Sequence, residues 1–426
     1  MNAFILAFYR FLVLPFAIVL LPFASLFNRK IREGFALRRK PWEALTTNVR
    51  PLWIHAASGE FEYAKALIRE FKSLRPHVPV VVTYFSPTFA ASAASFPGVE
   101  RAIALPVDLP GPCQSFLKRL NPQLLLIART DLWPEMMAQA RRRGVPTQLF
   151  SYTQKAFTSG FKRWFAGWIL RGIDHVYCVA ESDRNHLSAI HVHAEVLGDT
   201  RYDQVAHRLQ NPKAIAAELH PSDETPVFVA GSTWAEDEAV LLPALAEHLR
   251  AGRLKLVLVP HEPTPSHIAA LKNQLAKLDI RFSLFSAKKN WDASAVLLVD
   301  QVGFLAELYL WGDIAFVGGS FRKSVHSVME ALGAGCYTFV GPLHTNNREA
   351  IEFAALKFGD SHLDAGSGVE VVRDSVGLAA KVDRLLANQN VLETHRTAQL
   401  TEFGRRLGAS KVLALRVAST YFLSSG

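Results

Sequence analysis

The sequence lacks the residue patterns of disulfide-bonded and metal-binding proteins. It has three cysteines in 426 residues, Cys113, Cys178 and Cys336, and none is close to another. This excludes a disulfide framework and a cysteine-based zinc site, and it indicates a reducing compartment. No H-E-x-x-H pair and no Asp-x-Asp pair occurs. We therefore expect no metal and no resident cofactor.

The sequence also lacks three common motifs, two that bind nucleotides and one that carries a nucleophilic serine. The chain has no G-x-G-x-x-G, no G-x-x-x-x-G-K-[ST] and no G-x-S-x-G. The stretch GGSFRKS at 318–324 shares residue types with a phosphate-binding loop but not its spacing. These absences argue against a nicotinamide or flavin Rossmann enzyme, a P-loop NTPase and an α/β-hydrolase.

The N-terminus combines an apolar run with a basic cluster. Residues 3–27 contain Arg10 as their single charge, and residues 29–40 carry six basic side chains against one acid. The run is long enough to span a bilayer, and the following basic cluster predicts that the rest of the chain is cytoplasmic. Pro15, Pro22 and Arg10 leave a helix lying in the membrane interface open, and a buried helix is the third possibility. A cleaved signal peptide is the weaker interpretation.

The net charge of +9 does not indicate nucleic-acid binding, because no nucleic-acid-binding motif accompanies it. We expect a membrane as the anionic partner instead.

Short apolar runs alternate with helical stretches along the rest of the chain, which predicts an α/β protein with parallel sheets covered by helices on both faces. We expect two Rossmann-like doubly wound domains around a central cleft: residues 41–215 and residues 216–426, after an anchor and basic flank at 1–40. The terminal helix is free to pack back on the first domain. The predicted strands are Leu52–Ala56, Pro79–Tyr84, Gln123–Ala128, Thr147–Ser151, His175–Ala180, Val227–Ala230, Leu254–Val259, Ala295–Asp300, Ile314–Val317 and Tyr337–Val340.

Glu60 lies where the first predicted strand gives way to a helix, in HAASGEFEYAK. A carboxylate at a helix N-terminus complements the helix dipole, so a purely structural role is one interpretation. The other is chemical, because ligands of α/β proteins bind at the carboxyl ends of strands.

Three loops of the second half also follow predicted strands. Gly231-Ser232-Thr233 suits a phosphate at a helix N-terminus, although an ordinary N-cap explains it equally well. Pro260 and His261 follow the next strand. The glycine loop that begins at Gly318 leads to His326 and Glu330, which we expect on one face of a helix. Backbone N–H groups of this loop are expected to approach a phosphate, and Glu330 to hold ribose hydroxyls.

With these residues in view, the chain resembles the 3-deoxy-D-manno-octulosonic acid (Kdo) transferases of lipopolysaccharide biosynthesis. The motifs that carry the resemblance are HAASGEFEYAK, LPVDLP (105–110), TDLWPE (130–135), GDTRYDQV (198–205), GSTWAEDE (231–238), PHEP (260–263) and FVGGSFRKSVHSVMEAL…FVGP (316–342). The resemblance implies a GT-B fold and an inverting, metal-independent transfer of Kdo from CMP-Kdo to a lipid A precursor. It places the enzyme at the cytoplasmic face of the bacterial inner membrane.

The resemblance also implies roles for particular residues. Glu60 would be the general base. Contacts to CMP-Kdo would come from Arg201, Gly231, Ser232, Thr233, Pro260, His261, Gly318, Gly319, Ser320, His326 and Glu330. Contacts to the acceptor would come from Ser58, Gly59, Arg129 and Asp131. The sequence departs from the family pattern in a turn before Glu60 that is one residue short, in Arg129 where an acid is usual, and in Ser327 where Asn is common.

Two alternatives to this activity stay open. One is a GT-B enzyme that uses another nucleotide sugar, and the other is an inactive, membrane-tethered protein that binds a nucleotide or a lipid. The basic and aromatic stretch Phe161–Gly172 has two interpretations as well. It is either a surface that contacts the membrane at headgroup level or a core helix.

Overall fold

A computed structural model describes residues 3–38, 49–221, 224–359 and 363–423. The chain folds as two units. Unit 1 contains residues 1–204 and 406–426, and unit 2 contains residues 205–405. The boundary therefore lies within helix α10 (Thr200–Gln210) and not at residues 215 and 216, where the sequence placed it.

Unit 1 is built on a seven-stranded, fully parallel sheet with the strand order β3-β2-β1-β4-β5-β6-β7. The central strand β1 pairs with β2 on one side and β4 on the other. The strands are β1 (Leu52–His55), β2 (Val80–Tyr84), β3 (Arg101–Ala104), β4 (Leu124–Ala128), β5 (Thr147–Tyr152), β6 (His175–Cys178) and β7 (Ala194–Val196).

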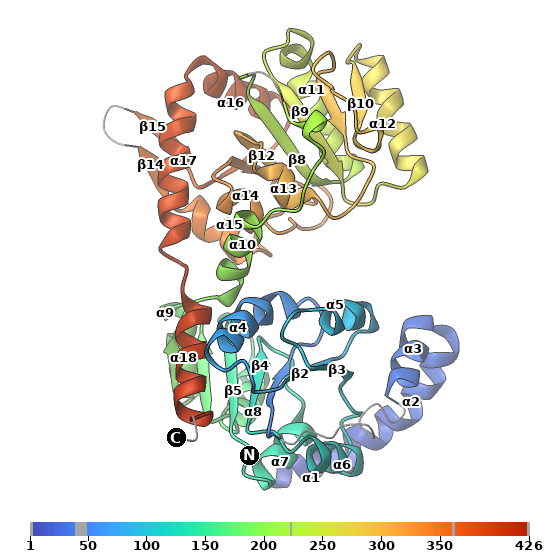
Figure 1. Cartoon of the computed structure of the whole chain (residues 1–426), viewed down its shortest axis with the longest axis vertical. Coiled ribbons are helices and arrows are strands. Elements are labelled where there is room, and N and C mark those ends of the chain that lie inside the picture. Colours follow the sequence, from blue (N-terminus) through green and yellow to red (C-terminus); the bar gives the residue numbers. More distant parts are fainter. Residues whose placement is uncertain (1–2, 39–48, 222–223, 360–362, 424–426) are drawn as a thin grey trace. The chain divides into compact units, whose positions relative to one another are not determined.

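Helices cover both faces of this sheet because the strand side chains are apolar on both faces. On one face, alternate residues such as Trp53 and Leu125 pack against α6 (Pro110–Leu120), α7 (Pro134–Arg142), α8 (Gly160–Leu170) and α9 (Glu181–Ser188). On the other face, Leu52 and Leu124 pack against α4 (Phe61–Leu74) and α18 (Ala409–Tyr421). The short helix α5 (Ala90–Ala94) precedes β3. The C-terminal helix thus belongs to unit 1, where it packs on α4 (Figure 1).

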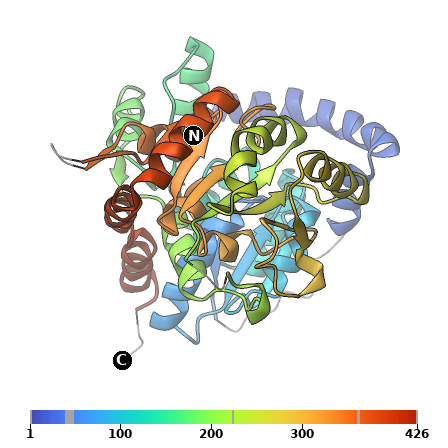
Figure 2. The ribbon, with the colours of Figure 1, turned by 90° about the horizontal axis from the view of Figure 1, so that it is seen from above.

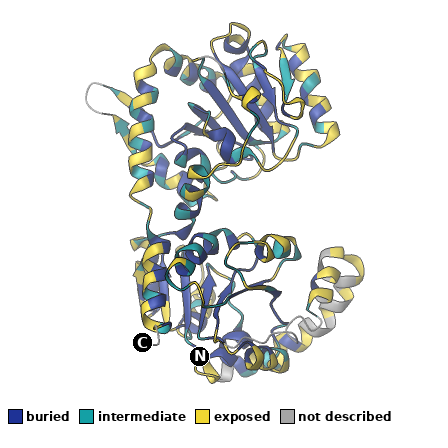
Figure 3. Cartoon of the chain, viewed as in Figure 1, coloured by how far each residue is buried: buried dark blue, intermediate teal, exposed yellow. Residues whose placement is uncertain are grey.

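Unit 2 repeats this architecture. Its seven-stranded parallel sheet has the order β10-β11-β9-β8-β12-β13-β16. The strands are β8 (Val227–Thr233), β9 (Lys255–Pro260), β10 (Phe282–Leu284), β11 (Val296–Leu298), β12 (Ile314–Val317), β13 (Tyr337–Val340) and β16 (Val369–Val371). Figure 3 shows that the strands of both sheets are buried while the outer helix surfaces are exposed.

Three helices of unit 2 share one core with one face of the sheet: α11 (Ala235–Arg250), α12 (Pro265–Lys277) and α16 (Ser375–Ala387). Helices α11 and α16 lie side by side in both views (Figures 1 and 2). The other elements are α13 (Leu305–Tyr309), α14 (Met329–Gly333), α15 (Arg348–Ala354), α17 (Gln389–Gly404) and the hairpin of β14 (Lys357–Gly359) and β15 (Asp364–Ser367).

The apolar run at the N-terminus does not form one helix. It is divided into α1 (Ala3–Phe8), a π-helical segment η1 (Tyr9–Val13) and α2 (Leu14–Phe27), which α3 (Arg29–Leu37) follows. Pro15 lacks an N–H group, so the regular hydrogen-bond ladder is interrupted close to η1. In the described part of the chain, no helix has both the length and the apolar character that a membrane crossing requires. The predicted transmembrane helix is therefore not supported. Arg39 and Lys40 of the predicted basic flank lie outside the described residues.

Two side chains of η1 attach this segment to unit 1. The Arg10 guanidinium donates to both carboxylate oxygens of Glu135, at 2.8 and 2.7 Å, and Glu135 is fully buried. Tyr9 donates to the Asp108 carboxylate at 2.8 Å, and Asp108 in turn accepts the backbone N–H groups of Glu135 and Met136 at the start of α7. Burial, followed by the charge of Asp108, raises the pKa of Tyr9. Arg10, which is unexpected in an apolar run, is thus explained by a partner in the fold.

Candidate active site

Glu60 is the residue that immediately precedes α4, at the carboxyl end of β1. Its side chain makes no hydrogen bond to the backbone of α4. Instead, Oε2 of Glu60 accepts the Ser58 backbone N–H at 2.9 Å and the Ser58 hydroxyl at 2.7 Å. The carboxylate is half-buried and held by the turn before it. Glu62, one residue into the helix, is placed to complement the dipole. Glu60 therefore stands at the N-terminus of α4, where its charge complements the helix dipole, but its side chain does not cap the helix.

The other predicted acceptor residues in this turn differ in their surroundings. Gly59 is exposed, and a Cβ added to it would approach nothing closer than Phe89, at 4.0 Å. A side chain would therefore fit at this position. Ser58, in contrast, supplies both hydrogen bonds that orient the Glu60 carboxylate.

Asp131 lies after β4 and is held by two side chains that the sequence did not reveal. Its Oδ2 atom contacts Nε2 of the buried His55 at 2.8 Å and accepts the indole N–H of Trp133 at 2.9 Å. Burial alone would raise the pKa of Asp131, but the hydrogen bond and charge of His55 outweigh it and lower that pKa. Asp131 is therefore a fixed carboxylate at the edge where β1 and β4 end.

Two predicted arginines meet on one aromatic ring in α4. Arg129 donates to the Tyr63 hydroxyl at 2.6 Å, and its guanidinium lies 4.9 Å from the ring centroid. The guanidinium of Arg201 lies 5.8 Å from the same centroid. Arg129 also has a left-handed backbone (φ +62°), which is uncommon outside glycine and typical of functional sites. Tyr63 stands three residues after Glu60, so the two arginines provide positive charge close to the candidate base. Tyr63 stands within HAASGEFEYAK but was not predicted as a site residue.

Arg201 was expected to contact the donor together with ten residues of the second half. It lies in unit 1, and the other ten lie in unit 2. Those ten occupy the carboxyl ends of three adjacent strands, β8, β9 and β12, which are neighbours in the sheet. This is the edge at which doubly wound sheets bind nucleotides.

The glycines of this edge allow the strands to approach each other closely. A Cβ on Gly231 would lie 2.1 Å from the Tyr309 hydroxyl oxygen, and one on Gly318 would lie 2.2 Å from the carbonyl oxygen of Ser232. Gly319 has φ +87°, and its Cβ would lie 2.4 Å from the Ser324 carbonyl oxygen. A larger residue would therefore require a backbone shift at Gly318 and Gly319, and displacement of the Tyr309 side chain at Gly231.

The expectation that the N–H groups of the glycine loop approach a phosphate is wrong for Gly318 and Gly319. Gly318 N–H donates to the Gly231 carbonyl at 2.9 Å, and Gly319 N–H donates to the buried Asp237 carboxylate at 2.7 Å. Asp237 also accepts the N–H groups of Phe321 and Trp234. Burial raises the pKa of Asp237, and these backbone donors oppose that rise. Asp237 therefore ties the loop to the start of α11.

Several predicted hydroxyl donors are also engaged within the protein. Thr233 is buried, and its hydroxyl donates to Glu238 at 2.8 Å. Glu238 in turn contacts Nε2 of His267 at 2.9 Å. Burial lowers the pKa of His267, but the Glu238 carboxylate outweighs this and raises it. Ser320 is buried and bonded to the backbone of Val317 and Gly341. Pro260 ends β9 and is buried as well.

Four of the ten donor-site residues keep exposed side-chain surface: Ser232, His261, His326 and Glu330. His261 and His326 stack, with ring centroids 4.1 Å apart. Glu330 accepts the hydroxyl of Ser327 at 2.6 Å. The predicted common helix face is wrong, because α14 begins only at Met329 and His326 lies in the loop before it. Trp234, which the sequence did not assign, contacts both histidines.

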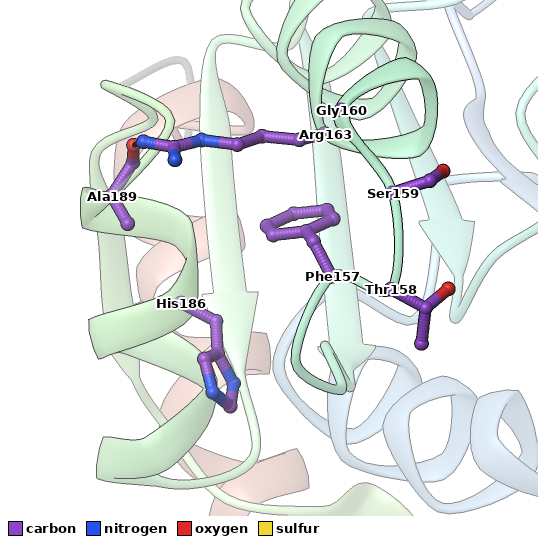
Figure 4. A pocket seen from close by; sticks show the side chains of 7 residues that line it. All are labelled: Phe157, Thr158, Ser159, Gly160, Arg163, His186 and Ala189. Carbon is purple, nitrogen blue, oxygen red and sulfur yellow. Dashed lines mark hydrogen bonds between the residues drawn. The ribbon is translucent and has the colours of Figure 1, made fainter.

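A separate pocket of about 390 Å³ lies in unit 1, beside the start of α8 (Figure 4). None of the residues predicted for the site lines it; its walls are formed by Phe157, Thr158, Ser159, Gly160, Arg163, His186 and Ala189. Arg163 reaches across it to the Ala189 carbonyl at 2.5 Å. Helix α8 confirms in part the core-helix interpretation of the basic and aromatic stretch, and contact of its exposed side with a membrane stays a prediction. Trp168 and Leu170 belong to the core, and Phe161, Trp164 and Phe165 are exposed.

The sequence matches the family described as 3-Deoxy-D-manno-octulosonic-acid transferase (kdotransferase) over residues 29–204. The 3-deoxy-D-manno-octulosonic acid transferase of Bordetella pertussis is 30% identical over 337 residues, which cover 73% of this chain and 77% of that protein. The chain belongs to this family. The enzyme of the same name from Haemophilus influenzae is 27% identical over 307 residues, covering 70% of this chain and 71% of its own. As a Kdo transferase family member, the protein is a glycosyltransferase.

Solved structures agree on the fold. A glycosyltransferase from Rickettsia africae superimposes with a TM-score of 0.55 at 11% identity, covering 89% of this chain and 100% of that one. The UDP-GlcNAc 2-epimerase of Neisseria meningitidis gives a TM-score of 0.60 at 13% identity, covering 87% and 100%. The two parallel-sheet α/β units are therefore shared with GT-B-type proteins, as the sequence predicted. Identities this low say nothing about substrate.

Proposed function

We propose that the protein transfers Kdo from CMP-Kdo to a lipid A precursor of the lipid IVA type, with inversion at the anomeric carbon and without a metal. Three observations support the proposal: membership of the Kdo transferase family, the placement of Glu60, and the loop cluster at the carboxyl edge of the second sheet. The lack of an Asp-x-Asp motif supports a metal-independent reaction. The observation that carries the proposal is the carboxylate of Glu60, which the Ser58 turn holds at a strand end without capping a helix.

Direct displacement accounts for the chemistry. An acceptor hydroxyl attacks the anomeric carbon of Kdo, the bond from that carbon to the CMP phosphate oxygen breaks, and Glu60 takes the hydroxyl proton. The departing phosphate gains charge, which nearby donors must stabilise. We propose His261, His326 and Ser232 for that side of the reaction because their side chains are exposed at the sheet edge. Arg129 and Arg201 are placed to attract anionic groups of the substrates.

The first prediction concerns the donor and the acceptor. Purified protein incubated with CMP-Kdo and lipid IVA should give CMP and a Kdo-bearing lipid, detected by mass spectrometry. Parallel incubations with UDP-sugars should give no transfer. Product formed only from a UDP-sugar would show a GT-B enzyme of another specificity. Binding of CMP-Kdo without any product would show an inactive binding protein and would contradict the proposal.

We further propose that the N-terminal segment attaches the protein to the cytoplasmic face of the inner membrane without crossing it. The side chains of Phe8, Phe11, Leu12, Phe16, Leu20, Phe23, Leu26 and Phe27 are exposed. Arg29 and Arg32, which follow, are exposed as well. Apolar side chains beside basic ones match a bilayer surface with anionic headgroups.

The second prediction tests this attachment by flotation with phosphatidylglycerol-containing vesicles. Replacing Phe11, Phe16 and Phe23 with Ser should reduce vesicle binding by at least about tenfold, because each buried aromatic contributes roughly 1.5–3 kcal/mol. The matched control replaces three exposed apolar residues of unit 2, Leu343, Ile351 and Val376, with Ser. If both triple variants bind vesicles equally well, the segment is not the membrane contact.

A further inference from the structure

Trp234 connects the residues at the carboxyl edge of the second sheet. It stands between β8 and α11, and its indole Nε1 lies 3.1 Å from Nε2 of His326. Its ring lies 4.9 Å from that of His261, which stacks on His326. Trp234 also contacts Arg322, whose guanidinium lies 3.8 Å from the Trp234 ring centroid. Trp234 is thus held in place by stacking while its N–H points at one particular nitrogen.

The chemistry of the indole group decides the protonation of His326. An indole N–H can only donate a hydrogen bond, so Nε2 of His326 must be the acceptor and carries no proton. A neutral imidazole has its single proton on the other nitrogen. His326 is therefore the tautomer with N–H at Nδ1. Protonation at Nε2 would set two N–H groups against each other and break this bond.

The surroundings of His326 also disfavour a positive charge on its ring. His261 stacks directly on it. The Arg322 guanidinium lies over the Trp234 ring and forms an ion pair with Glu236 at 3.7 Å. Asp237 is buried and already accepts three backbone N–H groups, and Glu330 accepts the Ser327 hydroxyl. Burial and then His261 lower the pKa of His326 to about 4. The ring therefore stays neutral at physiological pH and acts as a hydrogen-bond donor.

The ring orientation leaves the donor available. A Cβ added to Gly319 would lie 3.0 Å from Cδ2 and 3.1 Å from Nε2 of His326, so this edge of the imidazole faces the glycine loop and Trp234. Nδ1 is on the opposite edge. His326 is only half-buried.

We propose that Trp234 is a positioning residue that fixes His326 as the Nδ1–H tautomer, and that this N–H donates to a phosphate oxygen of CMP. The inference rests on the proposed function for the identity of the ligand. It assigns Trp234 no contact with the reacting atoms. It also makes His326 a fixed donor to the leaving group and not an acid or base.

The tautomer is tested first, in the ligand-free full-length protein. The ¹⁵N shifts of the His326 ring, assigned by comparison with His326→Asn, should show Nδ1 protonated and Nε2 unprotonated. In Trp234→Phe, which keeps the ring and removes the N–H, the two shifts should move toward each other as both tautomers become populated. Trp311→Phe is the matched control, since Trp311 stacks on His220 with centroids 4.6 Å apart. A wild-type His326 protonated at Nε2, or shifts unchanged in Trp234→Phe, would overturn the proposal.

The ligand is tested by calorimetry with CMP. An Asn side chain places an N–H near the Nδ1 position of His, whereas a Gln side chain places one near Nε2. His326→Asn is therefore expected to bind CMP at least about tenfold more tightly than His326→Gln, the difference that one hydrogen bond to a charged oxygen makes. Equal losses in the two variants would overturn the role of Nδ1. If the wild-type protein does not bind CMP, the proposed function fails, and the ¹⁵N shifts still decide the tautomer.

Discussion

Replacing Glu60 with Gln should lower kcat for Kdo transfer by at least about 10²-fold, because a positioned general base contributes roughly 10²–10⁴-fold. Gln is isosteric with Glu and keeps an oxygen that can accept from Ser58, so the turn is expected to stay in place. The amide cannot accept the proton of the acceptor hydroxyl. Affinity for CMP should not change, because Glu60 is not among the predicted donor contacts, ten of which lie in unit 2. Single-turnover transfer and calorimetry with CMP measure the two quantities separately.

Glu62→Gln is the matched control for this experiment. Glu62 is an acid in the first turn of the same helix and forms a partly buried ion pair with Lys65. If an acidic side chain matters here only because it complements the helix dipole, the two substitutions should have similar small effects on stability and none on kcat. If Glu60 is the base, the rate should fall in Glu60→Gln alone. A Glu60→Gln enzyme that keeps wild-type turnover would remove Glu60 from the mechanism.

The positions of the ten predicted strands could be read from the sequence because most of them are rich in apolar and β-branched residues. Four further strands of the two seven-stranded sheets were missed: β3 and β7 in unit 1, and β10 and β16 in unit 2. They are three or four residues long, and β3 begins with Arg101 and β7 carries Glu195 at its centre. Sequence pattern alone does not distinguish such segments from loops. These strands are stabilised by pairing with a neighbouring strand and not by their own composition.

The site was harder to predict than the fold for a similar reason. The glycine loop was recognised, but the sequence does not say which acceptor takes each N–H. The acceptor for Gly319 is Asp237, 82 residues earlier in the chain. The same holds for Trp234: it was visible within GSTWAEDE, yet its contact with His326 spans 92 residues. Local patterns predict where a polar group lies along a strand or loop, and only the tertiary fold decides its partner.

Arg10→Ala should detach the N-terminal segment from unit 1. Glu135 is fully buried, whereas Arg10 is 22% exposed. Removing the guanidinium leaves an unpaired carboxylate in the interior, and breaking a buried pair in this way costs about 3–5 kcal/mol. The equilibrium constant for local opening of residues 3–27 should therefore rise by roughly 10²–10⁴-fold. Hydrogen exchange of these residues, and their cleavage by a protease under native conditions, both report that constant.

Two comparison variants separate the ion pair from other causes. Arg29→Ala removes a cation from an exposed pair with Glu33, and the opening constant should change little because surface pairs contribute at most about 1 kcal/mol. Arg10→Ala combined with Glu135→Leu leaves no buried carboxylate at position 135 without its cation, so most of the lost protection should return. Protection that stays at the wild-type level in Arg10→Ala would mean that the ion pair does not hold the segment. If the double variant restores protection, the buried carboxylate of Glu135 is the reason why the otherwise apolar N-terminus needs a charge. The length of the Arg10 side chain is then not the reason.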